Sequence, residues 1–139
     1  MQTCHYRLLA TLSFSLTLLI LLMPGSMIEY LEIKLSEWFA LPSLPPGLDS
    51  SPIDKLIHTG LFAVCGFLLT RGWLHQTRSW LPLLLLLIAY AAITETLQYF
   101  IPGRGASTAD FLADGIGAAI GILLALHVIS RTGIDNLKE

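Results

Sequence analysis

Four long apolar runs constrain the fold of this 139-residue chain more than any other feature. They cover residues 8–28, 53–69, 80–101 and 111–129. Each is close to the roughly 20 residues that an α-helix needs to cross the hydrocarbon core of a membrane. Only 13% of the residues are charged, against about 25% in soluble domains. The sequence therefore predicts an all-α, polytopic membrane protein with four transmembrane helices, in a single domain that spans residues 1–139.

The first apolar run follows Arg7, so a cleaved signal peptide is an alternative to an anchor. No convincing cleavage site with small residues follows Met23. We therefore expect an uncleaved first transmembrane helix.

The segment between the first two runs predicts a further helix that lies in the lipid–water interface on the external side of the membrane. Its apolar side chains recur at helical spacing, and polar side chains stand between them. The alternative is an extension of the first transmembrane helix. The apolar residues are Ile28, Leu31, Leu35, Trp38 and Phe39, and the polar ones are Glu29, Glu32, Ser36 and Glu37.

The lysines and arginines predict the orientation, because the cytoplasmic loops of membrane proteins carry an excess of them. With both termini in the cytoplasm, five of these residues are inside and three are outside. The inner set is Arg7, Arg71, Arg78, Arg131 and Lys138, and the outer set is Lys34, Lys55 and Arg104. We therefore expect both termini in the cytoplasm.

Eight polar or ionisable residues lie in or beside the last three apolar runs, where such groups are costly and mark a functional site by default. With a rise of about 1.5 Å per residue, His58, Glu95 and Asp114 would lie roughly 6–9 Å below the outer ends of their helices. The sequence thus predicts one outward-facing polar layer shared by three helices. Its candidate binding residues are Asp54, Lys55, His58, Glu95, Gln98, Arg104, Asp110 and Asp114.

Some members of this set also have ordinary roles. Ser51 with Asp54, and Ser107 with Asp110, have the spacing of capping boxes at helix N-termini. For the two aspartates, capping and function are equally open and compatible.

Lys55 could extend to the membrane surface, and His58 could be a core histidine bonded to a carbonyl group. Arg104 could be a solvated charge in its Pro-Gly-Arg-Gly turn. Glu95 and Asp114 have no capping role available, so they are the strongest candidates. We expect Glu95 to pair with Arg104 or His58.

Other patterns restrict the function further. Gly117 and Gly121 have the spacing that lets membrane helices approach closely, either within the chain or between two copies in a homo-oligomer. Cys4 and Cys65 are too far apart along the predicted helices to form a disulfide, and Cys65 is expected to pack in the core. A net charge of −2 and the absence of basic stretches argue against nucleic-acid binding. No phosphate loop, zinc motif or nucleophile elbow is present, so no cofactor is predicted and metal binding stays unassigned.

The motifs Asp54-Lys55-Leu56-Ile57-His58 and Glu95-Thr96-Leu97-Gln98-Tyr99-Phe100-Ile101-Pro102-Gly103-Arg104, followed by Asp110, Asp114, Gly117 and Gly121, resemble the VanZ-like family of small bacterial membrane proteins. The resemblance covers about residues 52–126. Many members have asparagine near Asp114, so the resemblance does not imply a charge there. The founding member is linked to teicoplanin resistance, an antibiotic-resistance role that the resemblance does not extend to this chain. What it implies is a protein of the bacterial cytoplasmic membrane that works in the cell envelope, without a defined activity.

Three functions fit these observations. The polar layer could bind an anionic envelope lipid or a lipid-linked precursor, with Arg104 and Lys55 contacting phosphate and the carboxylates contacting amino or hydroxyl groups. The chain could instead be an enzyme on such a lipid, with His58 or Glu95 as general base and a divalent metal held by carboxylates. The third alternative is a structural polar network without a ligand.

Overall fold

The computed structural model describes residues 2–39 and 52–135, which contain five helices and no strand. Four of the helices are long and apolar enough to cross a membrane. The predicted all-α fold is therefore confirmed, including a separate helix between the first two spans. The helices are α1 (Gln2–Leu21), α2 (Gly25–Phe39), α3 (Pro52–Thr77), α4 (Leu81–Gln98) and α5 (Thr108–Asp135).

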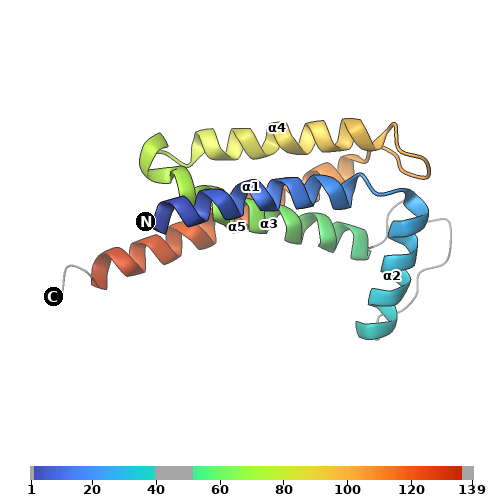
Figure 1. Cartoon of the computed structure of the whole chain (residues 1–139), viewed down its shortest axis with the longest axis horizontal. Coiled ribbons are helices and arrows are strands. Elements are labelled where there is room, and N and C mark those ends of the chain that lie inside the picture. Colours follow the sequence, from blue (N-terminus) through green and yellow to red (C-terminus); the bar gives the residue numbers. More distant parts are fainter. Residues whose placement is uncertain (1, 40–51, 136–139) are drawn as a thin grey trace.

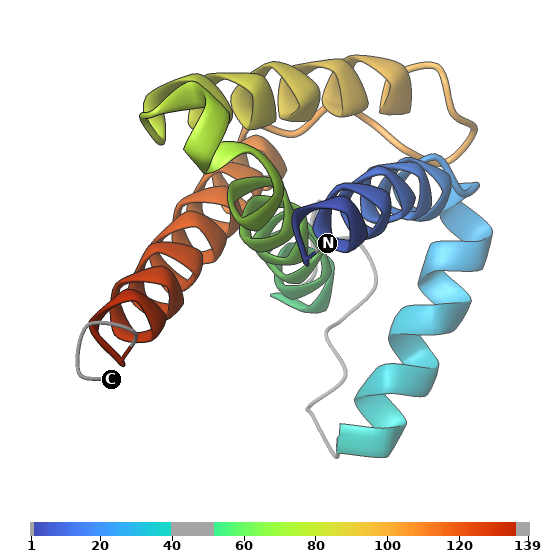
Figure 2. The same ribbon diagram turned by 60° about the vertical axis from the view of Figure 1, so that its left-hand side comes forward.

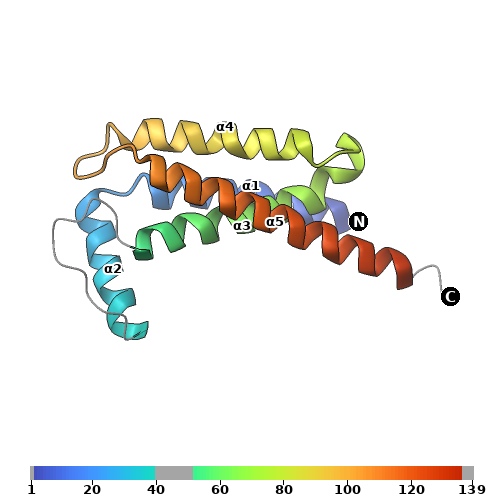
Figure 3. The ribbon, with the colours of Figure 1, turned by 180° about the vertical axis from the view of Figure 1, so that it is seen from behind.

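The four long helices lie side by side along the molecule, whereas α2 crosses this direction at one end (Figure 1). We call this end the α2 end. It also holds the end of α1, the start of α3 and the loop between α4 and α5. The N-terminus, the α3–α4 turn and the end of α5 lie at the opposite end. The view from behind shows α5 running the length of the bundle and α2 standing apart from it (Figure 3).

The boundary predicted for the first transmembrane helix was wrong. A helix to residue 28 was expected, but α1 ends at Leu21 and α2 begins at Gly25. Pro24 is the cause, because proline has no N–H group to donate and its ring clashes with a continuing helix. Its carbonyl group accepts the N–H groups of Met27 and Ile28, so Pro24 also starts α2. The end of α3 was placed too early, since polar residues after Leu69 continue the helix to Thr77.

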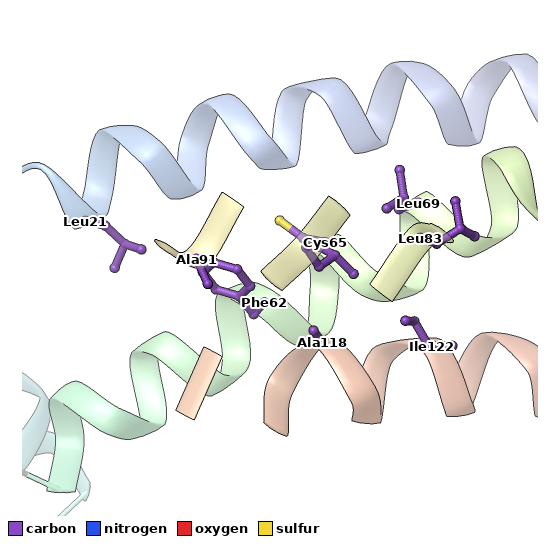
Figure 4. Close-up of a cluster of buried hydrophobic side chains, with 9 residues drawn as sticks. Leu21, Phe62, Cys65, Leu69, Leu83, Ala91, Ala118 and Ile122 are labelled. Carbon is purple, nitrogen blue, oxygen red and sulfur yellow. The ribbon is translucent and has the colours of Figure 1, made fainter. Parts of the chain in front are cut away.

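The core lies where α3 meets α1, α4 and α5 (Figure 4). Phe62, Leu87 and Ala91 have no exposed surface. Cys65 is also fully buried, with its Sγ 3.4 Å from the hydroxyl of Thr17. Both cysteines are free, and Cys65 has the packing role expected from the sequence.

The closest helix pair is α3 with α5, and glycine makes it possible. A Cβ atom on Gly117 would collide with the carbonyl group of Thr59, and one on Gly121 would collide with that of Ala63. On the other helix, Gly66 lies against the backbone of Ala118 in the same way. The small-residue face of α5 is thus covered by α3 of the same chain. A second copy could reach this face only by displacing α3.

We predict that Gly117→Ala lowers the free energy of unfolding by about 1–3 kcal/mol, because the new methyl group has no room against α3. Gly60→Ala is the matched control, since a Cβ there meets nothing within 4 Å. It should leave stability equal or slightly higher, by up to about 1 kcal/mol. Thermal unfolding of both variants in detergent measures the difference. Equal melting temperatures would contradict the close α3–α5 contact.

Two contacts place basic residues together at the end opposite α2. The Nε of Arg7 donates to the carbonyl oxygen of Gly72 at 3.0 Å, and Arg71 donates to the hydroxyl of Tyr6 at 3.2 Å. These contacts put α1 and α3 in register, so that Arg7 and Arg71 share one membrane side.

We predict that reporters fused after residues 5, 75 and 135 read as cytoplasmic, and that reporters near residues 46 and 105 read as external. The physical reason is the excess of lysine and arginine at the end opposite α2. Inverted signals at residues 46 and 75 would contradict this orientation and would place the polar layer at the inner membrane face.

Candidate functional site

Six of the eight predicted polar residues meet near the α2 end of the bundle, around His58. They come from the first two turns of α3, the last turn of α4, the α4–α5 loop and the first two turns of α5. We call this group the His58 cluster. Its members are Asp54, His58, Glu95, Arg104, Asp110 and Asp114.

The shortest contact in the cluster joins α3 to α5. The Nδ1 of His58 lies 2.9 Å from Oδ1 of Asp114, and both side chains are fully buried. On the other side of the ring, Nε2 of His58 lies 3.5 Å from Nη2 of Arg104. Because a guanidinium group only donates hydrogen bonds, Nε2 is the acceptor and Nδ1 carries the proton that it donates to Asp114. The histidine is therefore held in one tautomer, with its lone pair toward Arg104.

Arg104 is held over this ring by Asp54 and by its loop. Its Nη1 lies 3.4 Å from Oδ1 of Asp54, and its side chain is only 9% exposed. The preceding Gly103 has φ +74°, a conformation that favours glycine. The loop is braced from α2, because the N–H group of Gly25 donates to the carbonyl oxygen of Pro102 at 3.1 Å.

Glu95 has a different main partner from the one expected. Its Oε2 accepts the backbone N–H of Ser107 at 2.7 Å, and its Oε1 lies 4.0 Å from Nδ1 of His58. Among the described residues, the carboxylate that pairs with Arg104 is that of Asp54. Of the two partners predicted for Glu95, only His58 is near it.

The cap of α5 also differs from the prediction. Ser107 Oγ accepts the N–H of Asp110 at 3.2 Å, so the serine half of the capping box is present. The N–H of Ser107 bonds to Glu95, which thus takes the reciprocal role expected of Asp110. The corresponding prediction for Asp54 involves Ser51, which lies outside the described residues.

The other two predicted residues have separate places. The Nε2 of Gln98 donates to the carbonyl oxygen of Leu21 at 3.0 Å, which ties α4 to the end of α1. Lys55 is half-buried in the first turn of α3.

Three carboxylate oxygens of the cluster are buried and have no hydrogen-bond partner within residues 2–39 and 52–135: Glu95 Oε1, Asp110 Oδ1 and Asp114 Oδ2. Buried acceptors without a donor cost free energy, of the order of 1–3 kcal/mol each. A proton, a cation or a donor group of a ligand would satisfy them. The cluster is thus able to accept more donors than the described residues supply.

The cluster forms the base of an open cleft of about 950 Å³ between α2, the α4–α5 loop and the first turns of α3 and α5. Asp54, Arg104 and Asp110 line it from the cluster side, and Glu29 and Glu32 line it from α2. Sequence analysis placed these two glutamates on an interfacial helix but did not assign them to the site. The signal that could have found them is the Pro24-Gly25 break, which ends α1 and starts α2 beside the α4–α5 loop.

A family profile described as VanZ/LLP1 matches residues 5–130. The chain belongs to the VanZ-like family. The resemblance noted over residues 52–126 is therefore confirmed, and it extends through α1 and α2. Searches among curated proteins and solved structures found no match. With its four apolar helices, this VanZ-like protein is an integral membrane protein.

The VanZ-like site offers two sets of three metal-binding side chains. One set is Asp54, His58 and Asp110, and the other is His58, Glu95 and Asp114. Within each set the ligand atoms lie within 4.8 Å of one another. Chemically, the same arrangement can bind a cation, donate from Arg104 to an anion, or accept a proton at Nε2 of His58.

We predict that Glu95→Leu destabilises the protein by about 1–3 kcal/mol relative to Glu95→Gln, because leucine leaves the Ser107 N–H without an acceptor. Glutamine keeps the shape and one carbonyl oxygen. Thermal unfolding in detergent measures both, with Thr96→Ala, an exposed neighbour on α4, as the control. If both Glu95 variants melted like the wild type, the cap between Glu95 and Ser107 would have no stabilising role.

Proposed function

We propose that this VanZ-like protein binds a phosphate-bearing envelope lipid, or a lipid-linked precursor, in the cleft above the His58 cluster. The observation that carries the proposal is Arg104, a largely buried cation at the base of a polar cleft that opens beside α2. A guanidinium group can contact a phosphate through two parallel hydrogen bonds. Lys55, in the first turn of α3, is a second cation at the same end.

The position of α2 supports a lipid ligand. Its exposed side chains include Met27, Tyr30, Ile33 and Trp38, the last of them 84% exposed. Lys34 and Glu37 form an exposed ion pair on the same helix. Aromatic and charged residues mixed in this way favour the level of the lipid head groups. The cleft between α2 and the bundle would then open where the phosphates of lipids lie.

The charges of the cleft restrict the ligand. Within the described residues, its lining has four acidic residues and one arginine: Glu29, Glu32, Asp54, Asp110 and Arg104. A bare anion would be repelled by the carboxylates, whereas a head group with amino or hydroxyl groups beside its phosphate would satisfy both signs. We therefore expect a ligand that presents phosphate to Arg104 and donors to the carboxylates.

One observation favours a catalytic variant of this function. The hydrogen bond from His58 to Asp114 leaves Nε2 as an acceptor toward Arg104, which lines the cleft, and a lone pair at Nε2 is what a general base needs. In that case His58 would take a proton from a water or hydroxyl group, and Arg104 would hold the phosphate. The unpartnered oxygens weigh against the third alternative, a self-contained network, because such networks stabilise when all their members are satisfied.

Arg104→Lys should reduce the amount of phospholipid that copurifies with the protein to less than about half, because lysine cannot make two parallel contacts to one phosphate. Arg104→Ala should reduce it further, and Lys55→Arg should be the milder change. Native mass spectrometry in nanodiscs that contain phosphatidylglycerol and phosphatidylethanolamine measures the retained lipid, with membrane abundance checked in parallel.

The matched control is Arg131→Lys, an equal-charge substitution at an exposed position near the far end of α5. It should retain lipid like the wild type. Wild-type lipid retention in both Arg104 variants, at normal abundance, would rule out the role of Arg104 in lipid binding.

A further inference from the structure

The two nitrogens of His58 face different carboxylates, and only one of them has a lone pair to offer. Nδ1 donates to Asp114 at 2.9 Å, so Nε2 is the nitrogen with a lone pair for a metal ion, in place of its long contact at 3.5 Å to Arg104. Oδ1 of Asp54 lies 3.9 Å from Nε2, and ligand atoms of Asp54, His58 and Asp110 all lie within 4.8 Å of one another. A divalent ion bound at about 2.0–2.2 Å holds neighbouring ligand atoms roughly 2.8–3.6 Å apart, so the side chains would move inward by about 1 Å to close this site.

We infer that Asp54, Nε2 of His58 and Asp110 bind a divalent transition-metal ion, such as Zn²⁺ or Mn²⁺, at the base of the cleft. One imidazole and two carboxylates form a mixed ligand set that suits these ions better than Ca²⁺ or Mg²⁺, which prefer oxygen ligands alone. The cleft leaves room for water or a ligand oxygen in the remaining positions.

Asp110 gives independent support. Asp110 is only 5% exposed, and its Oδ1 has no hydrogen-bond partner in the described part of the chain. The N–H of Ser107, the donor that a capping box would supply to it, bonds to Glu95 instead. A cation at this oxygen would satisfy it without a hydrogen-bond donor.

The contact of Asp114 with His58 gives further support for the same site. Metal-binding histidines almost always donate their other N–H group to a carboxylate or carbonyl, which fixes the ring and raises its basicity. The contact between His58 and Asp114 has this form. Asp114 would thus be a positioning residue for the metal ligand.

The second set, with Glu95 and Asp114, is the weaker candidate. It uses Nδ1 of His58, which carries the proton, and Oε2 of Glu95 is bonded to Ser107. Neither Glu95 nor Asp114 lines the cleft, whereas Asp54 and Asp110 do. An ion from solvent therefore reaches two of the three ligands of the Asp54 set directly from the cleft.

Without a metal ion, the positive charge beside Asp54 and His58 is the guanidinium group of Arg104. Its contacts to Asp54 and His58 are long, at 3.4 and 3.5 Å, and it stands between Gly103 and Gly105. A bound ion would replace the guanidinium beside both residues and repel it toward the cleft. Metal binding and the position of Arg104 are thus coupled.

The test uses the full chain, purified in detergent and stripped of metal, with Zn²⁺ and Mn²⁺ as separate probes. Calorimetry for Zn²⁺ and electron paramagnetic resonance for Mn²⁺ should show one ion bound per chain for at least one of the two metals. Asp110→Asn and Asp54→Asn should each weaken binding about tenfold or more, and Asp114→Asn should weaken it about 10- to 100-fold. Glu37→Gln, which removes an exposed carboxylate of α2 that does not line the cleft, should bind within about twofold of the wild type.

Circular dichroism and size-exclusion profiles establish that each variant is folded. Wild-type affinity in both folded Asp54 and Asp110 variants would overturn the site, as would the absence of stoichiometric binding of either metal. Loss of binding in Glu95→Gln with normal binding in Asp110→Asn would place the ion in the other set and also overturn it. Because the probe is the ion alone, the result does not depend on whether the protein binds lipid.

Discussion

The close approach of α3 and α5 determines where the polar groups of this protein can meet. Gly117 and Gly121 let the backbone of α5 lie directly against that of α3. Thr59, which contacts Gly117, follows His58 in the chain, and Asp114 lies one turn before Gly117. The helix contact therefore places the imidazole of His58 within hydrogen-bond distance of Asp114. Packing and site are one feature here, since a wider helix separation would leave both groups buried and unpaired.

The cluster built on this contact is unusual in its balance of donors and acceptors. Four carboxylates surround one histidine and one arginine, and three carboxylate oxygens lack a donor within the described residues. Inside a membrane protein such a surplus of acceptors is expensive, and it is retained where a cation or ligand completes it. Because the cluster lies beside an open cleft, a cation or ligand from outside the bundle can approach these carboxylates.

Much of this arrangement could be predicted from the sequence, because membrane-length apolar runs and isolated ionisable residues are strong local signals. The four spans and the separate helix before Pro52 follow from hydropathy and helical spacing. Tertiary contacts decide the rest. Nothing local shows that Glu95 caps α5 through Ser107, or that Gln98 binds the carbonyl of Leu21, because the first contact depends on how the α4–α5 loop folds and the second joins helices that are distant in the chain. The end of α1 was misplaced because hydropathy continues past Pro24 although the helix does not.

Figure 2 shows α2 joined to the bundle at its first turn, with its far end held away from the long helices. At this joint the backbone of Gly25 contacts that of Gly103, and the two residues are too close for a side chain on Gly25. The joint therefore works as a rigid pivot with the Arg104 loop on one side and α2 on the other. A change in the tilt of α2 would therefore move the loop as well. The angle of one short helix is in this way linked to the position of a single guanidinium group.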